Sequence, residues 1–385
     1  VVAVGCLAQR YGKELAAELP EADAVLSFDD YADIGATLRK VLAGETITAH
    51  SPGDRRKLLP ISPVDRQLAT SEVSTPGMGP HVYRKRLEAT PWAPLKIASG
   101  CDRRCTFCAI PAFRGSFVSR DPGEIFEEAA WLGENGVREL LLVSENSTSY
   151  GKDLGDLRLL EKLLPLLVQP EGIEWVRVSY LQPAEMRPDL IGVIANTPGI
   201  VPYFDLSLQH VSKPHLRRMR RWGDGQRFLE RIERIRSLAP HAAFRTNFIV
   251  GYPGETEEDH DQLLSFVREA QLDWCGFFAF SPEEGTHALT LPDHVDVSLM
   301  NERLAELREI QDAISSDRRD LLLGETIEVL VDEPGIARSF REAPEIDGVV
   351  QVPDSLEVGR FHTVTVEQVF GPDLIAVEGS VANAR

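Results

Sequence analysis

The sequence predicts an α/β protein whose main domain is an open, partial (β/α)6 barrel of the TIM type. Three observations lead to this prediction. Apolar stretches of strand length alternate with amphipathic stretches of helix length in the middle of the chain. A proline-rich segment precedes this alternation, and short strand patterns follow it. At 385 residues the chain is also long enough for two or three domains.

Residues 1–50 alternate between strand and helix patterns and predict a small N-terminal α/β domain. We expect a strand at 1–4, a helix at 9–19, a short apolar stretch at 24–28 and a helix at 31–42. Cys6 lies where the first strand gives way to a loop, the usual place for a site in open α/β sheets. The chain begins inside a strand pattern and without methionine, so we expect further residues upstream and regard this domain as incomplete.

Residues 51–94 contain seven prolines that interrupt any periodic pattern, and they predict an interdomain linker. Residues 95–323 are predicted to form the barrel domain. Its strands are expected at 95–98, 139–144, 175–180, 203–208, 244–250 and 274–280. Its helices are expected at 123–134, 157–168, 188–195, 226–238, 256–270 and 298–323. Six strands are too few to close an eight-stranded barrel, so the site should lie at the C-terminal ends of an open sheet.

Residues 324–385 show short strand patterns separated by turn residues and predict a small all-β barrel or sandwich. The strands are expected at 327–331, 348–352, 362–369 and 374–377. This would be a separate domain appended to the barrel.

Composition limits the classes of partner. A formal charge of -19 argues against nonspecific binding to nucleic acid and favours a basic partner instead. We find no apolar run of membrane-spanning length and no charged leader followed by an apolar stretch. Five cysteines, three of them in one group, favour a reducing cytoplasm.

The candidate catalytic centre is that group of cysteines. Cys101, Cys105 and Cys108 follow the first barrel strand at a C-x3-C-x2-C spacing. A disulfide framework or a four-ligand zinc site fits this spacing poorly, whereas three thiolates can hold three irons of a four-iron, four-sulfur cluster and leave the fourth iron open. Arg103 and Arg104 between the thiols should favour their ionised form. A zinc loop, a redox loop and a purely structural cluster are the alternatives.

This spacing, with Phe107 before the last cysteine, resembles that of radical S-adenosylmethionine (SAM) enzymes. In these enzymes the amino and carboxylate groups of SAM chelate the open iron. The resemblance implies that Cys101, Cys105 and Cys108 are both the metal ligands and the catalytic centre, and that Phe107 lies against the cofactor.

Polar groups follow other strands where a bound cofactor would lie. Ser144, Glu145 and Asn146 offer acceptors for the ammonium of SAM. A second set follows the fifth strand, and its glycines would allow close backbone approach to a carboxylate or ribose: Gly251, Gly254 and Glu255. Each set could also be an ordinary strand-to-helix turn.

The end of the fourth strand carries further candidates. Gln209 is placed to contact the cofactor, and His210 could reach the substrate or be satisfied by local backbone. A basic patch beside this end is either a solvated face or a rim that positions an acidic target; it comprises Lys213, Arg217, Arg218, Arg220 and Arg221. Cys275 lies among aromatic residues and is assigned to the core.

Over nearly its whole length the chain resembles the methylthiotransferase branch of radical SAM enzymes. The matching segments are 96–108, 114–115, 119–120, 208–210, 219–221 and 248–256. The resemblance implies a second four-iron, four-sulfur cluster held by three cysteines of the N-terminal domain, of which Cys6 matches the last. It also implies that residues 324–385 form a TRAM domain that recognises the substrate.

Within this branch, residues 338–348 resemble the enzymes that methylthiolate the β-carbon of an aspartate in ribosomal small-subunit protein twelve. Charge supports this independently, because residues 324–385 carry 12 acidic residues against 4 arginines. Such an acidic domain should bind a basic ribosomal protein rather than RNA. The alternatives are a transfer RNA adenosine methylthiotransferase and a noncatalytic metal-binding module. Glu145-Asn146 departs from the Gln-Asp pair expected in the family.

The resemblance also implies the course of the reaction. An electron from the cluster cleaves SAM to a radical, which removes hydrogen from an unactivated C–H bond of the target residue. Sulfur would then come from the second cluster and the methyl group from a second SAM. Such an enzyme needs an electron donor as a partner.

Overall fold

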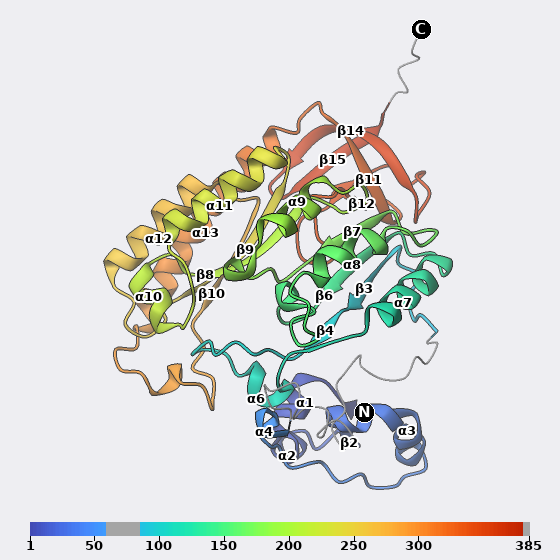
Figure 1. Ribbon diagram of the computed structural model, residues 1–385, viewed down its shortest axis with the longest axis vertical. Coiled ribbons are helices and arrows are strands. Elements are labelled where there is room, and N and C mark those ends of the chain that lie inside the picture. The colour runs from blue at the N-terminus through green and yellow to red at the C-terminus, as the bar shows by residue number, and fades with distance from the viewer. Residues whose placement is uncertain (59–84, 380–385) are drawn as a thin grey trace.

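The computed structural model describes residues 1–58 and 85–379 of the chain, and Figure 1 shows their arrangement. Six parallel strands follow one another in sequential order as two three-stranded sheets, which two isolated bridges join into an open barrel. They are β3 (Trp92–Lys96), β6 (Glu139–Val143), β7 (Trp175–Val178), β8 (Tyr203–Gln209), β9 (Ala243–Val250) and β10 (Trp274–Ala279). The join between β7 and β8 is the weakest, with two isolated bridges in place of a continuous ladder. The open, partial barrel is therefore confirmed.

Amphipathic helices cover the outer face of this sheet (Figure 1). They are α7 (Pro122–Glu134), α8 (Leu159–Leu167), α9 (Pro188–Asn196), α11 (Gly225–Leu238), α12 (Glu257–Ala270) and α13 (Val297–Asp320). Asp121 caps α7 by accepting hydrogen bonds from the amides of Gly123 and Glu124. Thr256 and Asp259 form a reciprocal capping box at the start of α12. Apolar side chains from the strands and from these helices form one continuous core.

Several boundaries differ from the prediction. β3 begins at Trp92, inside the predicted linker. Pro94 is tolerated within β3 because this is an edge strand, where the amide hydrogen that proline lacks is not needed for the sheet. The predicted helix at 9–19 is two helices, α1 (Cys6–Tyr11) and α2 (Lys13–Glu18), separated by Gly12. Gly12 has φ +47°, and a Cβ there would lie 2.3 Å from the His50 carbonyl oxygen.

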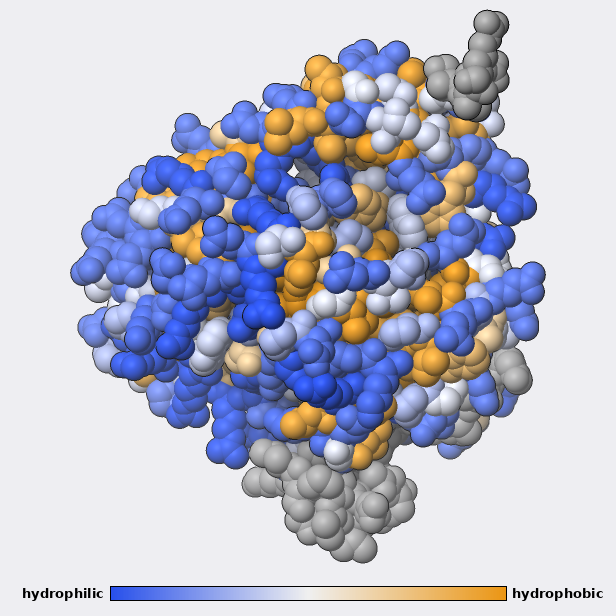
Figure 2. Space-filling model, turned by 45° about the horizontal axis from the view of Figure 1, so that its top comes forward, coloured by the Kyte–Doolittle hydropathy of each residue, from blue (hydrophilic) through white to orange (hydrophobic). Residues whose placement is uncertain are grey.

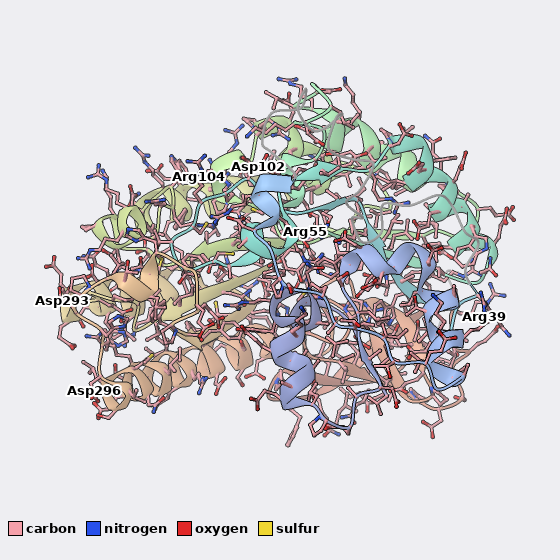
Figure 3. The ribbon with its side chains drawn as sticks, turned by 90° about the horizontal axis from the view of Figure 1, so that it is seen from below. Arg39, Arg55, Asp102, Arg104, Asp293 and Asp296 are labelled. Atoms are coloured by element: carbon pink, nitrogen blue, oxygen red, sulfur yellow. The ribbon has the colours of Figure 1, made fainter. Side chains whose placement is uncertain are left out.

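The rest of the N-terminal unit is small. β1 (Val2–Ala3) pairs in parallel with β2 (Ala24–Val25), followed by η1 (Phe28–Asp33), α3 (Ile34–Leu42) and α4 (Arg55–Leu58). Seen from below, this unit lies over part of the barrel mouth, with α4 beside Asp102 and Arg104 (Figure 3). The remainder of the predicted linker, residues 59–84, lies outside the described residues.

The C-terminal strands close into a five-stranded barrel with its own apolar core, which confirms the predicted all-β unit. The strands are β11 (Thr326–Glu333), β12 (Ile336–Arg338), β13 (Val350–Gln351), β14 (Phe361–Phe370) and β15 (Asp373–Glu378). β12 was not predicted, because three residues are too few to show a period.

This C-terminal barrel packs against the amino ends of the large sheet, opposite the mouth (Figure 1). Arg338 donates to the fully buried carboxylate of Glu139, with Nη1 and Oε2 2.6 Å apart, and Arg177 binds the other oxygen at 2.7 Å. Burial would raise the pKa of Glu139, but the two guanidinium groups outweigh it and lower that pKa. Nearby, Asp347 accepts from Tyr203 and Arg245, both at 2.6 Å. Buried ion pairs therefore lock the two domains together.

Hydrophilic side chains cover most of the face shown in Figure 2, with hydrophobic groups in smaller patches between them. This matches the acidic composition of the chain. Among the described helices, none combines the length and apolar character that a membrane span requires.

Removing one residue of the buried ionic network should lower the free energy of unfolding. We expect Arg338→Ala to destabilise the protein by about 3–5 kcal/mol, because Glu139 and Asp332 would keep buried charges without their partner. Arg360→Ala is the control, since Arg360 pairs with Glu357 at the surface and should matter by less than about 1 kcal/mol. Thermal unfolding of both variants measures the difference, and equal melting temperatures would mean that the buried network contributes no more than the surface pair.

Candidate active site

The cysteine loop leaves the sheet at β4 (Ala98–Ser99) and returns at β5 (Val118–Ser119), and these two short strands pair in antiparallel fashion. Gly100 begins the loop with φ +82°, and a Cβ there would lie 2.1 Å from the Ser116 carbonyl oxygen. The loop is held at its far side as well. The amide of Thr106 donates to Met219, and the Thr106 hydroxyl lies 2.7 Å from that of Tyr252. The loop therefore crosses the barrel mouth and is anchored on both sides.

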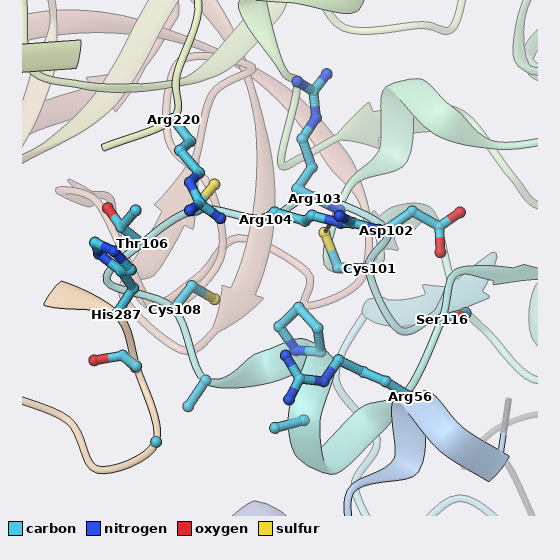
Figure 4. A pocket seen from close by; sticks show the side chains of 16 residues that line it. Arg56, Cys101, Asp102, Arg103, Arg104, Thr106, Cys108, Ser116, Arg220 and His287 are labelled. Carbon is cyan, nitrogen blue, oxygen red and sulfur yellow. Dashed lines mark hydrogen bonds between the residues drawn. The ribbon is translucent and has the colours of Figure 1, made fainter. Parts of the chain in front are cut away.

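Cys101, Cys105 and Cys108 all border one cavity of about 510 Å³. Figure 4 shows Cys101 and Cys108 on two sides of this shared space. Four arginines also line it, from the loop itself, from α4 and from the end of α10 (Lys213–Arg218): Arg56, Arg103, Arg104 and Arg220. The structure thus brings the three predicted thiols together in a strongly positive setting.

Arg103 lowers the pKa of the Cys101 thiol, as expected, but burial outweighs it, so the pKa values of Cys101 and Cys108 rise instead of falling. Burial raises the pKa of Cys101 to about 12 and that of Cys108 to about 11, and neighbouring thiols add to both shifts. The Arg103 amide donates to Cys101 Sγ at 3.4 Å, but this does not offset desolvation. Iron binding at these positions must therefore release protons.

The loop after β6 is tied to the cysteine loop through Glu185. Glu185 Oε2 accepts hydrogen bonds from Ser149 at 2.6 Å and Asn146 at 3.2 Å, and its other oxygen pairs with Arg103 at 2.8 Å. The Asn146 amide oxygen accepts from Thr148. These bonds engage the side chain of Asn146 within the protein. The predicted contact of Asn146 with the cofactor stays a prediction. Ser144 is likewise bonded within the loop, to the Ser147 hydroxyl and the Asn146 amide.

Glu145 instead belongs to a chain of contacts that joins the N-terminal unit to the mouth. Arg114, at the end of α6 (Ile110–Arg114), places Nη1 3.0 Å from Glu145 Oε1. The same guanidinium donates through Nη2 to Cys6 Sγ at 3.1 Å. Cys6 is exposed and is the first residue of α1. No local sequence pattern signals this arrangement, because the three residues are far apart along the chain.

The loop after β9 holds the side chain of Glu255 by contacts within the protein. Its carboxylate is buried, accepting from the Gly251 amide at 2.7 Å and from Arg303 of α13 at 2.9 Å. Burial raises the pKa of Glu255 to about 7. Glu255 therefore braces its loop and is not among the residues that line the cavity, and its predicted contact with a cofactor stays a prediction. Gly251 and Gly254 both have positive φ, and a Cβ on Gly251 would lie 2.6 Å from Met300.

The end of β8 is also irregular. Gln209 has φ +74° and is half-buried, whereas His210 is fully buried and its Nδ1 accepts the Ser212 amide at 3.1 Å. The local backbone thus satisfies Nδ1 of His210, whereas its Nε2 makes no hydrogen bond within the described part of the chain, and a contact with the substrate stays a prediction. Phe107 and Cys275 pack against the hydrophobic core. None of these four side chains lines the cavity, and the contacts of Phe107 and Gln209 with a cofactor stay predictions.

The residues present fit the cofactors that the resemblance implies. Three thiols on one loop are the preferred ligands of an iron–sulfur cluster, and the cavity beside them can admit a ligand of the size of SAM. Glu145 Oε2 is buried and makes no hydrogen bond within the described part of the chain. A buried carboxylate oxygen without a donor is a suitable partner for an ammonium group.

An open barrel with three clustered thiols at its mouth is the arrangement of a radical SAM enzyme. The model of the radical SAM superfamily matches residues 95–267, and that of the TRAM domain matches residues 323–377. Three relatives carry the name ribosomal protein uS12 methylthiotransferase RimO. That from Cutibacterium acnes is 54% identical, covering 100% of this chain and 83% of the relative. Those from a Nocardioides species (54%; 98% and 80% covered) and Streptomyces coelicolor (52%; 98% and 81%) are comparable. The chain belongs to the RimO family of radical SAM methylthiotransferases.

The raised thiol pKa values can be tested in protein prepared without iron. At about pH 7.5, on the order of one in a thousand or fewer of the Cys101 and Cys108 side chains would be ionised, so alkylation by iodoacetamide should be slow. Their rates should rise steadily as the pH approaches 11. Exposed Cys6 is the internal control, and peptide mass spectrometry reports each site. Labelling of all three cysteines at equal rates would mean that the arginines outweigh burial.

Proposed function

We propose that this chain is a methylthiotransferase that acts on ribosomal protein uS12, adding a methylthio group to the β-carbon of one of its aspartates. The observation that carries this proposal is the identity of 54% with a protein named for that activity, over the full length of this chain. The three thiols at the barrel mouth supply the metal ligands that such chemistry requires.

In this proposal, Cys101, Cys105 and Cys108 hold a four-iron, four-sulfur cluster, and SAM binds beside it. Bound there, the two supply the radical chemistry that opens an unactivated C–H bond. The chain's own part is to fix the thiols, through Thr106 and Tyr252, and to line a cavity that limits access of water. Glu145 is the favoured partner for the SAM ammonium, because its Oε2 is buried without a donor in the described part of the chain.

A second cluster is proposed at Cys6, the position that matches the last of the three cysteines that hold it in the family. Cys6 is exposed, and α1 packs beside α6, the helix that directly follows the cysteine loop. The hydrogen bond from Arg114 to Cys6 Sγ supports a ligand role, since donors to cluster sulfurs tune cluster potentials. Sulfur for the product would come from this second site.

The acidic TRAM domain is the proposed docking surface for the basic substrate protein. Of its acidic residues, eight are exposed, against the single exposed Arg360 among its described residues. They are Glu325, Glu328, Glu333, Glu345, Asp354, Glu357, Glu367 and Glu378. Such a surface attracts a basic protein and repels RNA. A cytoplasmic electron donor completes the proposed set of partners.

Product analysis tests the main proposal. Anaerobic protein loaded with iron and sulfide, and given reductant and SAM, should add a methylthio mass to uS12 and leave transfer RNA unchanged. Cys105→Ala should abolish both this product and reductive cleavage of SAM, because one iron of the cluster loses its ligand. Modification of transfer RNA alone would overturn the substrate assignment. SAM cleavage that persists in Cys105→Ala would contradict the assigned centre.

The contact between Arg114 and Cys6 gives a second test. Arg114→Gln should shift the reduction potential of a cluster at Cys6, measured by redox titration, because a charged donor to its sulfur is lost. Arg10→Gln is the matched control: Arg10 pairs with Glu283 across the same interface but does not touch Cys6. Equal shifts in the two variants would mean that Arg114 acts only by docking the N-terminal unit.

A further inference from the structure

Within the described chain, two of the four arginines in the cavity are without an ionic partner. Arg103 pairs with Glu185 at 2.8 Å, and Arg56 pairs with Asp54 at 2.6 Å. The side chains of Arg104 and Arg220 make no hydrogen bond or ion pair with any residue in 1–58 or 85–379. Both border the space that holds the three thiols (Figure 4). The cavity thus carries two guanidinium groups that make no ion pair with the described residues, beside one carboxylate, that of Asp102.

The backbone at Arg220 is also unusual. The Arg221 amide donates to the Leu216 carbonyl and the Arg220 amide to that of Arg217, which is the Schellman arrangement that ends a helix. Arg220 occupies the left-handed position of this motif, with φ +55°, where glycine is strongly preferred. An arginine here costs stability relative to glycine, which points to a function for its side chain. Arg221 points elsewhere, donating to the Ser207 carbonyl and to Cys105 Sγ.

We propose that Arg220, together with Arg104, is the receptor for the carboxylate of the target aspartate. The inference rests on the proposed function and names a specificity-determining site within it. The β-carbon of an aspartate is bonded to its carboxyl group, so holding the carboxylate fixes the carbon whose hydrogen is removed. A guanidinium binds a carboxylate with two parallel hydrogen bonds, which defines orientation as well as position. An adenine base offers no carboxylate, so the same arginines would not orient such a base by this pair of hydrogen bonds.

SAM also carries a carboxylate, and the experiment must separate the two sources. Cluster-loaded protein with SAM is titrated with uS12 and with uS12 in which the target aspartate is replaced by asparagine. The wild-type chain should bind the aspartate form about tenfold more tightly. Arg220→Gln should lower this preference to about onefold. The effects of the arginine substitution and of the aspartate substitution on the binding free energy would then not be additive. The Kd for SAM and the absorbance of the cluster should stay unchanged.

Two further variants keep the test independent of folding. Arg217→Gln removes the same charge from an exposed position of α10 outside the cavity, and should retain the tenfold preference. Arg220→Gly should raise the melting temperature, because glycine suits this φ, yet lose the preference. A more stable variant that cannot tell aspartate from asparagine would separate recognition from folding.

The inference is overturned if the wild-type chain shows no preference, if Arg220→Gln keeps it, or if Arg217→Gln loses it equally. A weakened Kd for SAM with an unchanged preference would assign Arg220 to the carboxylate of SAM and would also overturn it. Failure of the proposed function looks different, because then the wild-type chain would form no methylthio product on uS12 at all.

Discussion

The anchoring of one loop across the barrel mouth is the constraint on which the rest of this structure depends. Cys101 donates its amide to the Gly115 carbonyl, Thr106 donates to Met219, and the Ala288 amide donates to the Thr106 carbonyl. These bonds connect the loop to its own return strand, to the end of α10 and to the segment after β10. Three thiols can hold one metal cluster only if their separations are fixed, and the hydrogen bonds fix them before any metal arrives. The cysteine loop also forms one wall of the cavity beside the thiols.

The opposite end of the sheet is closed by a different kind of interaction. Glu139, Arg177 and Arg338 form a buried ionic group between the large barrel and the TRAM domain. Buried charges of this kind contribute little net stability over apolar packing, but they tolerate only one arrangement of their partners. Asp347, bound by Tyr203 and Arg245, repeats the pattern a few residues later. Residues 338–348, singled out from the sequence as resembling one branch of the family, thus contain the side chains that fix the relative position of the two domains.

The periodic part of this molecule was predicted well from the sequence. Apolar runs of strand length located all six barrel strands to within a few residues, and the cysteine spacing identified the three thiols that border the cavity. β12 and α10, of three and six residues, were missed because each is too short to show a reliable period of its own. Side-chain roles were harder to predict, because long-range contacts decide them. Glu255 follows a glycine turn typical of a ligand site, yet Arg303 from a helix 48 residues later draws its carboxylate into the core. The effect of Arg103 on the thiols was judged from charge alone, whereas burial decides the pKa.

The TRAM domain lies far from the thiols, and if the substrate docks on this domain as proposed, the separation sets a minimum length for the substrate. The acidic surface and the thiols lie at opposite ends of the barrel strands, which are separated by roughly 20 Å for strands of this length. Because buried ion pairs prevent the TRAM domain from swinging toward the mouth, a single compact side chain cannot engage both. A partner that engages both sites must extend along the outside of the barrel. The enzyme would then select substrates by length, because shorter fragments could not contact the TRAM domain and the thiols at the same time.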